Sequence, residues 1–363
     1  MMLINQQDVE KSLKGWIDPY LRQDLVSAKM IRSIRIDEDG IRIEVAIGYP
    51  CQDFHPVIMA ALTEKVKSDT GVKSVTLSII QDIVSHAVQK NLKPLKGVKN
   101  IIAIASGKGG VGKSTTAVNL AASLAEDGAR VGILDADIYG PSVPHMLGLS
   151  GRPEIKPGDR ISPKRAFNLD VMSIGFLVDE DQPMIWRGPM VTGALQQLLQ
   201  QTDWDGIDYL IIDLPPGTGD IQLSLSQQIP VSGAVIVTTP QDIALLDAQR
   251  GLKMFQQVNI PVLGLVENMS LHICSHCGHE EPLFGEGGGQ KMAIKYGTDL
   301  LGALPLNLSI RQQADQGTPV VLVQPDGDIS RRYREIARRM AAQLALKSRD
   351  YSARFPTISV VND

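Results

Sequence analysis

The chain has 363 residues, of which 43% are hydrophobic and 21% charged, a composition typical of globular proteins and not of disordered or fibrous ones. Its length allows two domains, because a single core usually stops growing beyond about 250 to 300 residues. The formal net charge of -4 gives no overall basic field, so we expect no nucleic-acid partner. The chain opens with no signal-like pattern and contains no run of about 18 apolar residues, so we expect no membrane partner and a cytoplasmic location.

Residues 1–88 predict a small α/β domain. The periodicity indicates helices and strands in the order helix 9–17, strand 30–36, strand 41–47, helix 55–68 and strand 72–79. The following segment, 89–98, is polar and basic and contains Pro94 and Gly97, which is typical of a linker. A fragment beginning near Lys99 is therefore expected to fold, bind ATP and dimerise without the first domain.

Residues 99–347 predict a second, larger domain. Short, wholly apolar runs are typical of parallel strands buried on both faces, and they occur at 101–105, 131–134, 209–212, 234–238 and 262–266. Helical stretches separate these runs, the clearest being 113–126, and an amphipathic helix is expected at 329–346. This alternation predicts a doubly wound, mostly parallel α/β sheet, with residues 348–363 as a loose tail.

A glycine-rich loop lies between the first apolar run and the first helix of this domain. The order Gly107-x-x-x-x-Gly112-Lys113-Ser114 is the phosphate-binding loop pattern in the strand-to-helix context that the motif requires. Backbone N–H groups and the helix N-terminus would hold phosphates, Lys113 would reach the outer phosphates, and Ser114 would bind Mg²⁺. The expected nucleotide contacts in the loop are Gly107, Lys108, Gly109, Gly110, Val111, Gly112, Lys113, Ser114 and Thr115.

Acidic side chains follow two of the predicted strands. Asp213 ends one strand and suits a carboxylate that holds Mg²⁺ through water, and the rigid loop 214–220 after it is placed to sense the third phosphate. Asp135 and Asp137 follow another strand, and we expect Asp137 to orient or activate the attacking water. The alternative is that Asp135 and Asp137 are only turn residues.

The extra lysine in the loop, Lys108, is not needed to hold the phosphates of its own site. It resembles the mark of the deviant Walker A class of P-loop ATPases, which includes the nitrogenase iron protein and the septum-positioning and plasmid-partition ATPases. In that class the lysine reaches the nucleotide of the partner subunit, so the resemblance implies a two-fold homodimer in which Lys108 is catalytic together with Lys113, Asp137 and Asp213.

Longer stretches resemble one branch of that class, the Mrp/ApbC family of iron-sulfur cluster carrier ATPases. The resemblance covers about residues 99–346 and rests on segments 135–142, 186–190, 204–220, 267–270 and 274–278. It implies that Asn268 recognises the adenine base, whereas the residue type alone also suits a loop or helix cap. The first domain resembles the MIP18-like domain often found ahead of this ATPase, and Cys51 stands where that domain tends to carry a cysteine.

Cys274 and Cys277 have the spacing of metal-binding cysteines, but a closed tetrahedral zinc site or an iron-sulfur cluster requires four ligands. Two copies of the pair in a homodimer would supply four. The sequence leaves a bridging cluster, a bridging zinc ion and a redox dithiol open, and the family resemblance favours a cluster, of the 4Fe-4S type. Cys51 suits either a small buried side chain or a role in cluster or client handling.

These observations together predict an ATP-hydrolysing iron-sulfur cluster carrier or scaffold. It would bind a cluster at the dimer interface and transfer it to apo iron-sulfur client proteins, with ATP and Mg²⁺ at the phosphate loop. The alternative is a dimeric ATP-dependent switch that positions DNA or a protein, with a structural zinc site at the cysteine pair.

Overall fold

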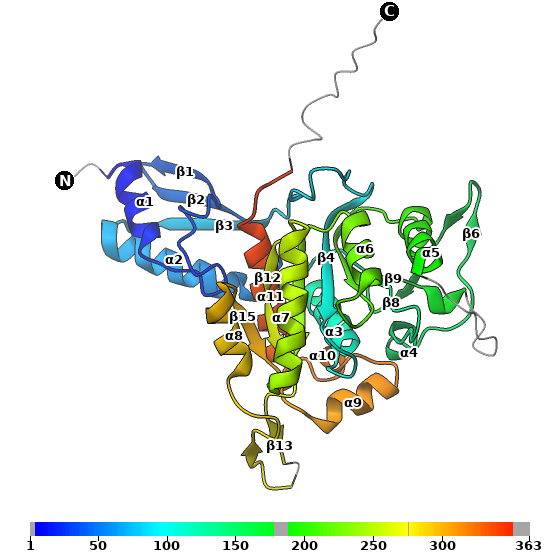
Figure 1. The fold of residues 1–363 in the computed structure, drawn as a ribbon. Helices are drawn as coiled ribbons and strands as arrows, with labels where there is room; N and C mark the ends of the chain where they lie inside the picture. The colour runs from blue at the N-terminus through cyan, green and yellow to red at the C-terminus, as the bar shows by residue number, and fades with distance from the viewer. Residues whose placement is uncertain (1–3, 178–187, 275, 351–363) are drawn as a thin grey trace, which may run out of the picture.

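The computed structural model describes residues 4–177, 188–274 and 276–350 (Figure 1). The first domain has a three-stranded sheet in the order β1-β2-β3, where β1 is antiparallel and β3 parallel to β2. Two helices pack on it, and Asn5 and Asp8 form a capping box that begins the first of them. The elements are α1 (Gln6–Lys14), β1 (Ile31–Asp37), β2 (Gly40–Ile47), the 3-10 turn η1 (Gln52–Phe54), α2 (His55–Thr70) and β3 (Val75–Gln81).

The second domain is built on an eight-stranded sheet. Its order is β15-β12-β11-β4-β10-β5-β9-β8, and the pairs are parallel except for the antiparallel edge pair of β9 with β8. This confirms the predicted doubly wound, mostly parallel sheet. The strands are β4 (Val98–Ser106), β5 (Val131–Asp135), β8 (Lys164–Ala166), β9 (Leu169–Ser173), β10 (Ile207–Asp213), β11 (Gly233–Thr238), β12 (Val262–Glu267) and β15 (Leu300–Ala303).

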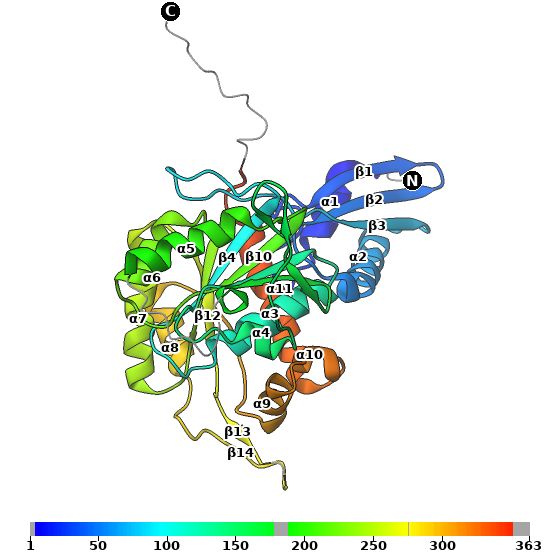
Figure 2. The same cartoon turned by 90° about the vertical axis from the view of Figure 1, so that its right-hand side faces the viewer.

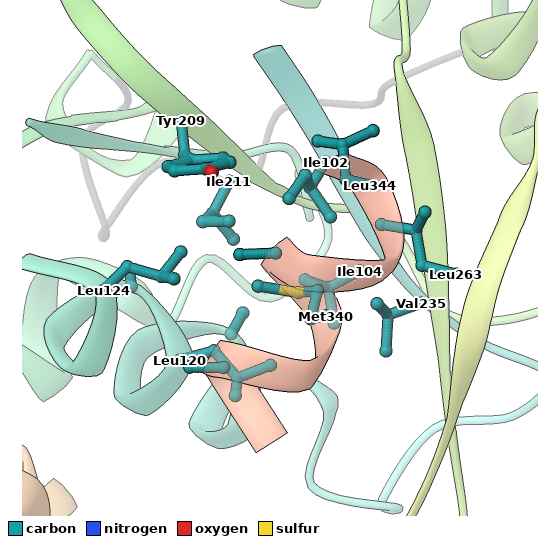
Figure 3. Close-up of a cluster of buried hydrophobic side chains, with 14 of the residues drawn as sticks. Ile102, Ile104, Leu120, Leu124, Tyr209, Ile211, Val235, Leu263, Met340 and Leu344 are labelled. Atoms are coloured by element: carbon teal, nitrogen blue, oxygen red, sulfur yellow. The ribbon is translucent and has the colours of Figure 1, made fainter. Parts of the chain in front are cut away.

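Helices cover both faces of this sheet (Figure 2). The helix α3 after the glycine-rich loop and the C-terminal helix α11 pack together on one face, where Leu120, Leu124, Met340 and Leu344 meet strand side chains such as Ile104 (Figure 3). Burying this apolar surface is the main driving force for the fold. The helices are α3 (Lys113–Glu126), α4 (Val143–Met146), η2 (Ile174–Phe176), α5 (Gly188–Gln201), α6 (Asp220–Gln228), α7 (Asp242–Gln257), α8 (Gly288–Tyr296), α9 (Leu308–Asp315), α10 (Val320–Val323) and α11 (Asp328–Ala345).

Two short hairpins complete the domain. One pairs β6 (Ile155–Lys156) with β7 (Arg160–Ile161), and the other pairs β13 (His272–Ile273) with β14 (Glu280–Glu281). Within the described ranges, none of the helices combines the length and the apolar character that crossing a bilayer would need.

The two domains share a continuous hydrophobic core. At their contact, the guanidinium group of Arg338 on α11 donates two hydrogen bonds of 2.6 Å to Asp127, which directly follows α3. The same guanidinium lies over the rings of Tyr20 and Phe54 of the first domain, at 5.7 and 5.9 Å from the ring centroids. The first domain therefore sits against the far end of the helix that begins at the glycine-rich loop.

The predicted linker is a coil, but it is fixed to the second domain. The side-chain amide of Gln89 donates to the carbonyls of Ser226 and Ile229, at 2.8 and 3.1 Å. The predicted tail is also fixed at its start, because Ala87 donates to the Ser348 carbonyl. The prediction of a loose tail was therefore wrong for residues 348–350, and residues 351–363 lie outside the described part of the chain.

These contacts change the expected behaviour of a fragment that begins at Lys99. The buried Asn100 side chain accepts from the backbone N–H of His86 and donates to the Val84 carbonyl, and truncation at Lys99 removes both of these partners, leaving the weaker bond to the Asp208 carbonyl. Each lost bond to a buried polar group costs about 1–3 kcal/mol. We expect fragment 99–350 to unfold several degrees below fragment 83–350 in thermal denaturation, while both bind ATP. Equal melting temperatures would show that the segment before Lys99 contributes nothing.

Candidate functional site

The glycine-rich loop lies at the carboxyl end of β4, between the ends of β10 and β11. In a doubly wound sheet, this end of the central strands is where ligands bind. Gly112 caps α3 with a φ of 81°, a left-handed conformation that favours glycine, and a β-carbon there would collide with the Asn268 amide. The loop borders a cavity of about 510 Å³.

Residues from five parts of the chain line this cavity. Of the predicted contacts, Gly109, Gly110, Gly112, Lys113, Ser114, Thr115, Asp137 and Asn268 line it, together with Pro216 of the predicted phosphate-sensing loop. Gly107, Lys108 and Val111 lie in the same loop but are not part of the lining. The structure therefore brings most of the predicted nucleotide contacts together around one cavity.

Lys113 is the central charge of the site. Its side chain is 5% exposed, its Nζ lies 2.7 Å from Oδ1 of Asp213, and a second carboxylate, that of Asp137, lies at 3.7 Å. The ammonium group thus holds together acidic side chains from the ends of β10 and β5. Phosphates entering the cavity would meet this ammonium group and the N-terminus of α3.

Asp213 is fully buried, and its Oδ2 has no hydrogen-bond partner in the described part of the chain. Burial raises the pKa of Asp213, and Lys113 opposes the shift. A buried carboxylate oxygen without a partner beside a serine hydroxyl suits a hard cation such as Mg²⁺. Ser114 and Asp213 therefore fit the magnesium site that the sequence predicts.

Asp135 lies opposite Asp213 in the register of the neighbouring parallel strands. Its carboxylate, however, already accepts hydrogen bonds from other groups. It accepts from the backbone N–H groups of Asp137 and Val143 and from the Ser173 hydroxyl. Burial raises the pKa of Asp135 to about 7, with a smaller contribution from the Asp213 carboxylate. Asp135 therefore shapes the loop after β5, whereas Asp137 faces the cavity.

The raised pKa of Asp135 makes the stability of the nucleotide-free protein depend on pH. Because the folded state holds a proton with a pKa near 7 and the unfolded chain has a value near 3.8, the folded state binds more protons between these values. Stability should fall as pH rises through this window. We expect the unfolding free energy of the wild type, relative to that of Asp135→Asn, to decrease by on the order of 1 kcal/mol or more between about pH 5 and pH 8. The measurement is the unfolding free energy from urea titrations, with chelator present, at several pH values. If this free energy changed with pH in the same way in the wild type and in Asp135→Asn, the prediction would be wrong.

Lys108 points toward α7 and not into its own cavity. Its Nζ donates to Oε1 of Gln241 at 3.3 Å, and Gln241 is the residue before α7. Its backbone carbonyl accepts from the Ser106 hydroxyl, which fixes the loop at that point. In this single chain the Lys108 ammonium group therefore lies outside the lining of its own cavity.

Asn268 follows β12 and supports the loop from the side. Its side-chain amide donates to the Val111 carbonyl at 2.8 Å, and its side chain is buried. The family resemblance implies that the same side chain recognises the adenine base, and Asn268 lines the cavity. The position of Asn268 on the cavity agrees with that role and adds a structural one.

Sequence patterns missed one wall of the cavity. His145 on α4 lies on this lining, as do Ile310, Arg311 and Asp315 on α9 and the loop residues Pro305, Leu306 and Asn307. The only signal for the loop is that it follows a short apolar run at the carboxyl edge of the sheet, where loops bind ligands in this fold class. The α9 residues carry no motif.

The cysteine pair lies on the β13–β14 hairpin, which projects from the sheet edge where the cavity lies (Figures 1 and 2). Cys277 is exposed and Cys274 half-buried. The backbone N–H groups of Cys277 and His276 lower the pKa of Cys274, which favours the thiolate that binds metals. Among the described residues, no three His, Cys, Asp or Glu side chains lie close enough to share a metal ion, so the pair has no third ligand there.

Cys51 occupies a different environment. It is 0% exposed at the contact between the domains, and burial raises its pKa. The described structure therefore favours the interpretation of Cys51 as a small buried side chain.

Comparison with known proteins agrees with this geometry. Residues 97–341 match a family described as NUBPL iron-transfer P-loop NTPase, and residues 6–79 match one described as iron-sulfur cluster assembly protein. An iron-sulfur cluster carrier protein of Escherichia coli (strain K12) is 49% identical over 337 residues, covering 93% of this chain and 91% of that protein. The iron-sulfur cluster transfer protein NUBPL of Mus musculus is 52% identical over 264 residues, covering 72% and 82%.

Solved structures agree on the fold. A nucleotide-binding protein of Archaeoglobus fulgidus in complex with ADP is 37% identical, with a TM-score of 0.54 over 61% of this chain and 87% of that one. The cell division ATPase MinD of Pyrococcus furiosus is 22% identical, with a TM-score of 0.50 over 66% and 98%, which shows a shared fold alone. Trp186 and Arg187 of the resemblance lie outside the described residues. The resemblance seen in the sequence is confirmed: the chain belongs to the iron-transfer P-loop NTPase family, and it carries an iron-sulfur cluster assembly domain at its N-terminal end.

Proposed function

We propose that the protein is an ATP-hydrolysing carrier that binds an iron-sulfur cluster between two protomers and transfers it to apo-proteins. The observation that carries the proposal is the exposed hairpin with two thiols, half of a cluster's ligand set, beside the cavity of a P-loop NTPase. The names of the relatives, carrier and transfer proteins for iron-sulfur clusters, support the same cargo.

In the proposed hydrolysis, each side chain of the cavity has one role. Lys113 holds the outer phosphates and stabilises the charge that develops on them, while Ser114 and Asp213 would hold Mg²⁺, which would neutralise phosphate charge. Asp137 lies near the ammonium group and accepts a hydrogen bond from the attacking water, which orients it.

The proposed homodimer supplies what one chain lacks. In the single chain the Lys108 ammonium group donates to Gln241, and in the dimer it would exchange this bond for the outer phosphates of the partner's nucleotide. The same two-fold axis brings two copies of Cys274 and Cys277 together, which gives four thiolates for one cluster, of the 4Fe-4S type.

Anaerobic purification with an absorbance spectrum and metal analysis tests the cargo. Iron with acid-labile sulfide, transferable to an apo-ferredoxin, is the expected result. Stoichiometric zinc without sulfide would instead favour a positioning switch with a structural zinc site.

A further inference from the structure

The segment between β12 and the cysteine hairpin makes a sharp turn in the wall of the nucleotide cavity. Asn268 and Met269 both line the cavity, and five residues after Met269 the chain reaches Cys274. Met269 has a φ of 55°, a left-handed conformation that non-glycine residues adopt at a cost. Backbone strain of this kind persists only where surrounding contacts hold it, and it is frequent at functional sites.

Contacts hold this elbow, residues 268–269, on both sides. Before the turn, the Asn268 amide donates to the Val111 carbonyl of the phosphate loop at 2.8 Å. After the turn, the N–H of Ser270 donates to the Leu304 carbonyl at 2.9 Å, and Leu306 donates to the Leu271 carbonyl at 2.7 Å. Leu306 itself lines the cavity, so the base of the hairpin is attached to two walls of the nucleotide site.

Among the residues that the structure describes, the hairpin has few other contacts that support it. Its strands are two residues each, and its tip is closed by the bonds from Cys274 N–H to the His279 carbonyl and from Gly278 N–H to the Cys274 carbonyl, both 2.9 Å. Such a short hairpin is marginally stable by itself. Its order therefore depends on how firmly its base is held.

We propose that the Asn268–Met269 elbow couples the nucleotide site to the cysteine hairpin, so that a nucleotide in the cavity orders the hairpin and fixes the position of its two thiols. This deepens the proposed function and rests on it, because the position of the thiols matters here as the position of a cluster's ligands. Asn268 and Met269 act here as positioning residues: they move no proton and hold no iron.

Hydrogen exchange of the full-length, cluster-free protein tests the coupling. The readout is the peptide containing the amides of Cys274 and Gly278, measured with and without saturating Mg-ADP, which lacks the third phosphate that the partner's lysine would contact. In the wild type we expect nucleotide to slow exchange at least about 5-fold, at the low end of usual coupling between sites. In Met269→Gly, at an ADP concentration that titration calorimetry shows to be saturating for this variant, the slowing should fall below about 2-fold.

A matched control separates the elbow from glycine's general effect. Asn259 precedes the same strand, β12, has a φ of 57° and is exposed away from the cavity. Asn259→Gly should keep the full nucleotide effect on the hairpin.

Two results overturn the inference: unchanged exchange in nucleotide-bound wild type, or full slowing in nucleotide-bound Met269→Gly. Iron loading of the same preparations separates this failure from failure of the proposed function. If the wild type loads a cluster but nucleotide does not slow exchange, the coupling through the elbow is wrong and the carrier function stands. If nucleotide slows exchange but no cluster is loaded, the proposed carrier function is wrong.

Discussion

Lys113→Ala should reduce ATP turnover by at least about 100-fold, the usual cost of removing one preorganised charge from a transition state. The ammonium group lies 2.7 Å from Asp213 and borders the cavity, so its loss leaves negative carboxylates facing negative phosphates. Steady-state phosphate release at saturating ATP measures the effect. Lys253→Ala, which removes an exposed lysine from α7, is the control and should retain full turnover.

The same substitution should also affect stability. Without Lys113 the buried Asp213 carboxylate has lost its cation, which in a dry site costs about 3–5 kcal/mol unless the group takes up a proton. The double variant Lys113→Ala/Asp213→Asn should recover part of the melting temperature while staying inactive. Turnover near the wild-type rate in a folded Lys113→Ala protein would remove Lys113 from the mechanism.

Replacing Cys274 or Cys277 with Ala should abolish cluster binding, because a symmetric mutant dimer would offer two thiolates where a cluster requires four. In the wild type we expect saturation at about four iron and four sulfide per two chains for a 4Fe-4S cluster. Iron and sulfide content after anaerobic reconstitution gives both results. Nucleotide affinity, taken on the same samples, should stay measurable in each variant because the phosphate loop is intact.

Two controls come from the chain itself. Cys51→Ala removes a thiol that is buried between the domains, and it should keep its cluster. His279→Ala changes an exposed neighbour of the pair on the hairpin and should also keep it. A full cluster on an isolated monomer, or unchanged iron in Cys277→Ala, would contradict the bridging arrangement.

Local sequence patterns were enough to predict those parts of the site that come from a single continuous segment of the chain. Residues 113–126 form the predicted helix, and the strands before Asp135 and Asp213 lie within a residue or two of the predicted ranges. Glycine spacing, apolar runs and strand-end carboxylates are each defined by a few neighbouring residues of the sequence. The parallel sheet then brings these segments to one edge.

Contacts between distant segments could not be read in this way. Asp127 and Arg338 are separated by 211 residues and meet only after α3 and α11 have packed together. The wall formed by α9 carries no motif, and the left-handed backbone of Met269 has no signal in a residue type that rarely adopts it. The linker is predicted from its polar composition. Composition indicates that a segment is exposed to solvent, but it does not predict the hydrogen bond that Gln89 makes with the second domain.

The N-terminal domain and the cysteine hairpin occupy opposite ends of the sheet in both views (Figures 1 and 2). A bead, electrode or sensor chip coupled to the N-terminal domain would therefore leave the thiols directed away from the support. If the protein carries a cluster as proposed, a sample immobilised in that orientation would be loaded with iron and sulfide first and exposed to apo-protein afterwards, which would make loading and release separate steps on one surface.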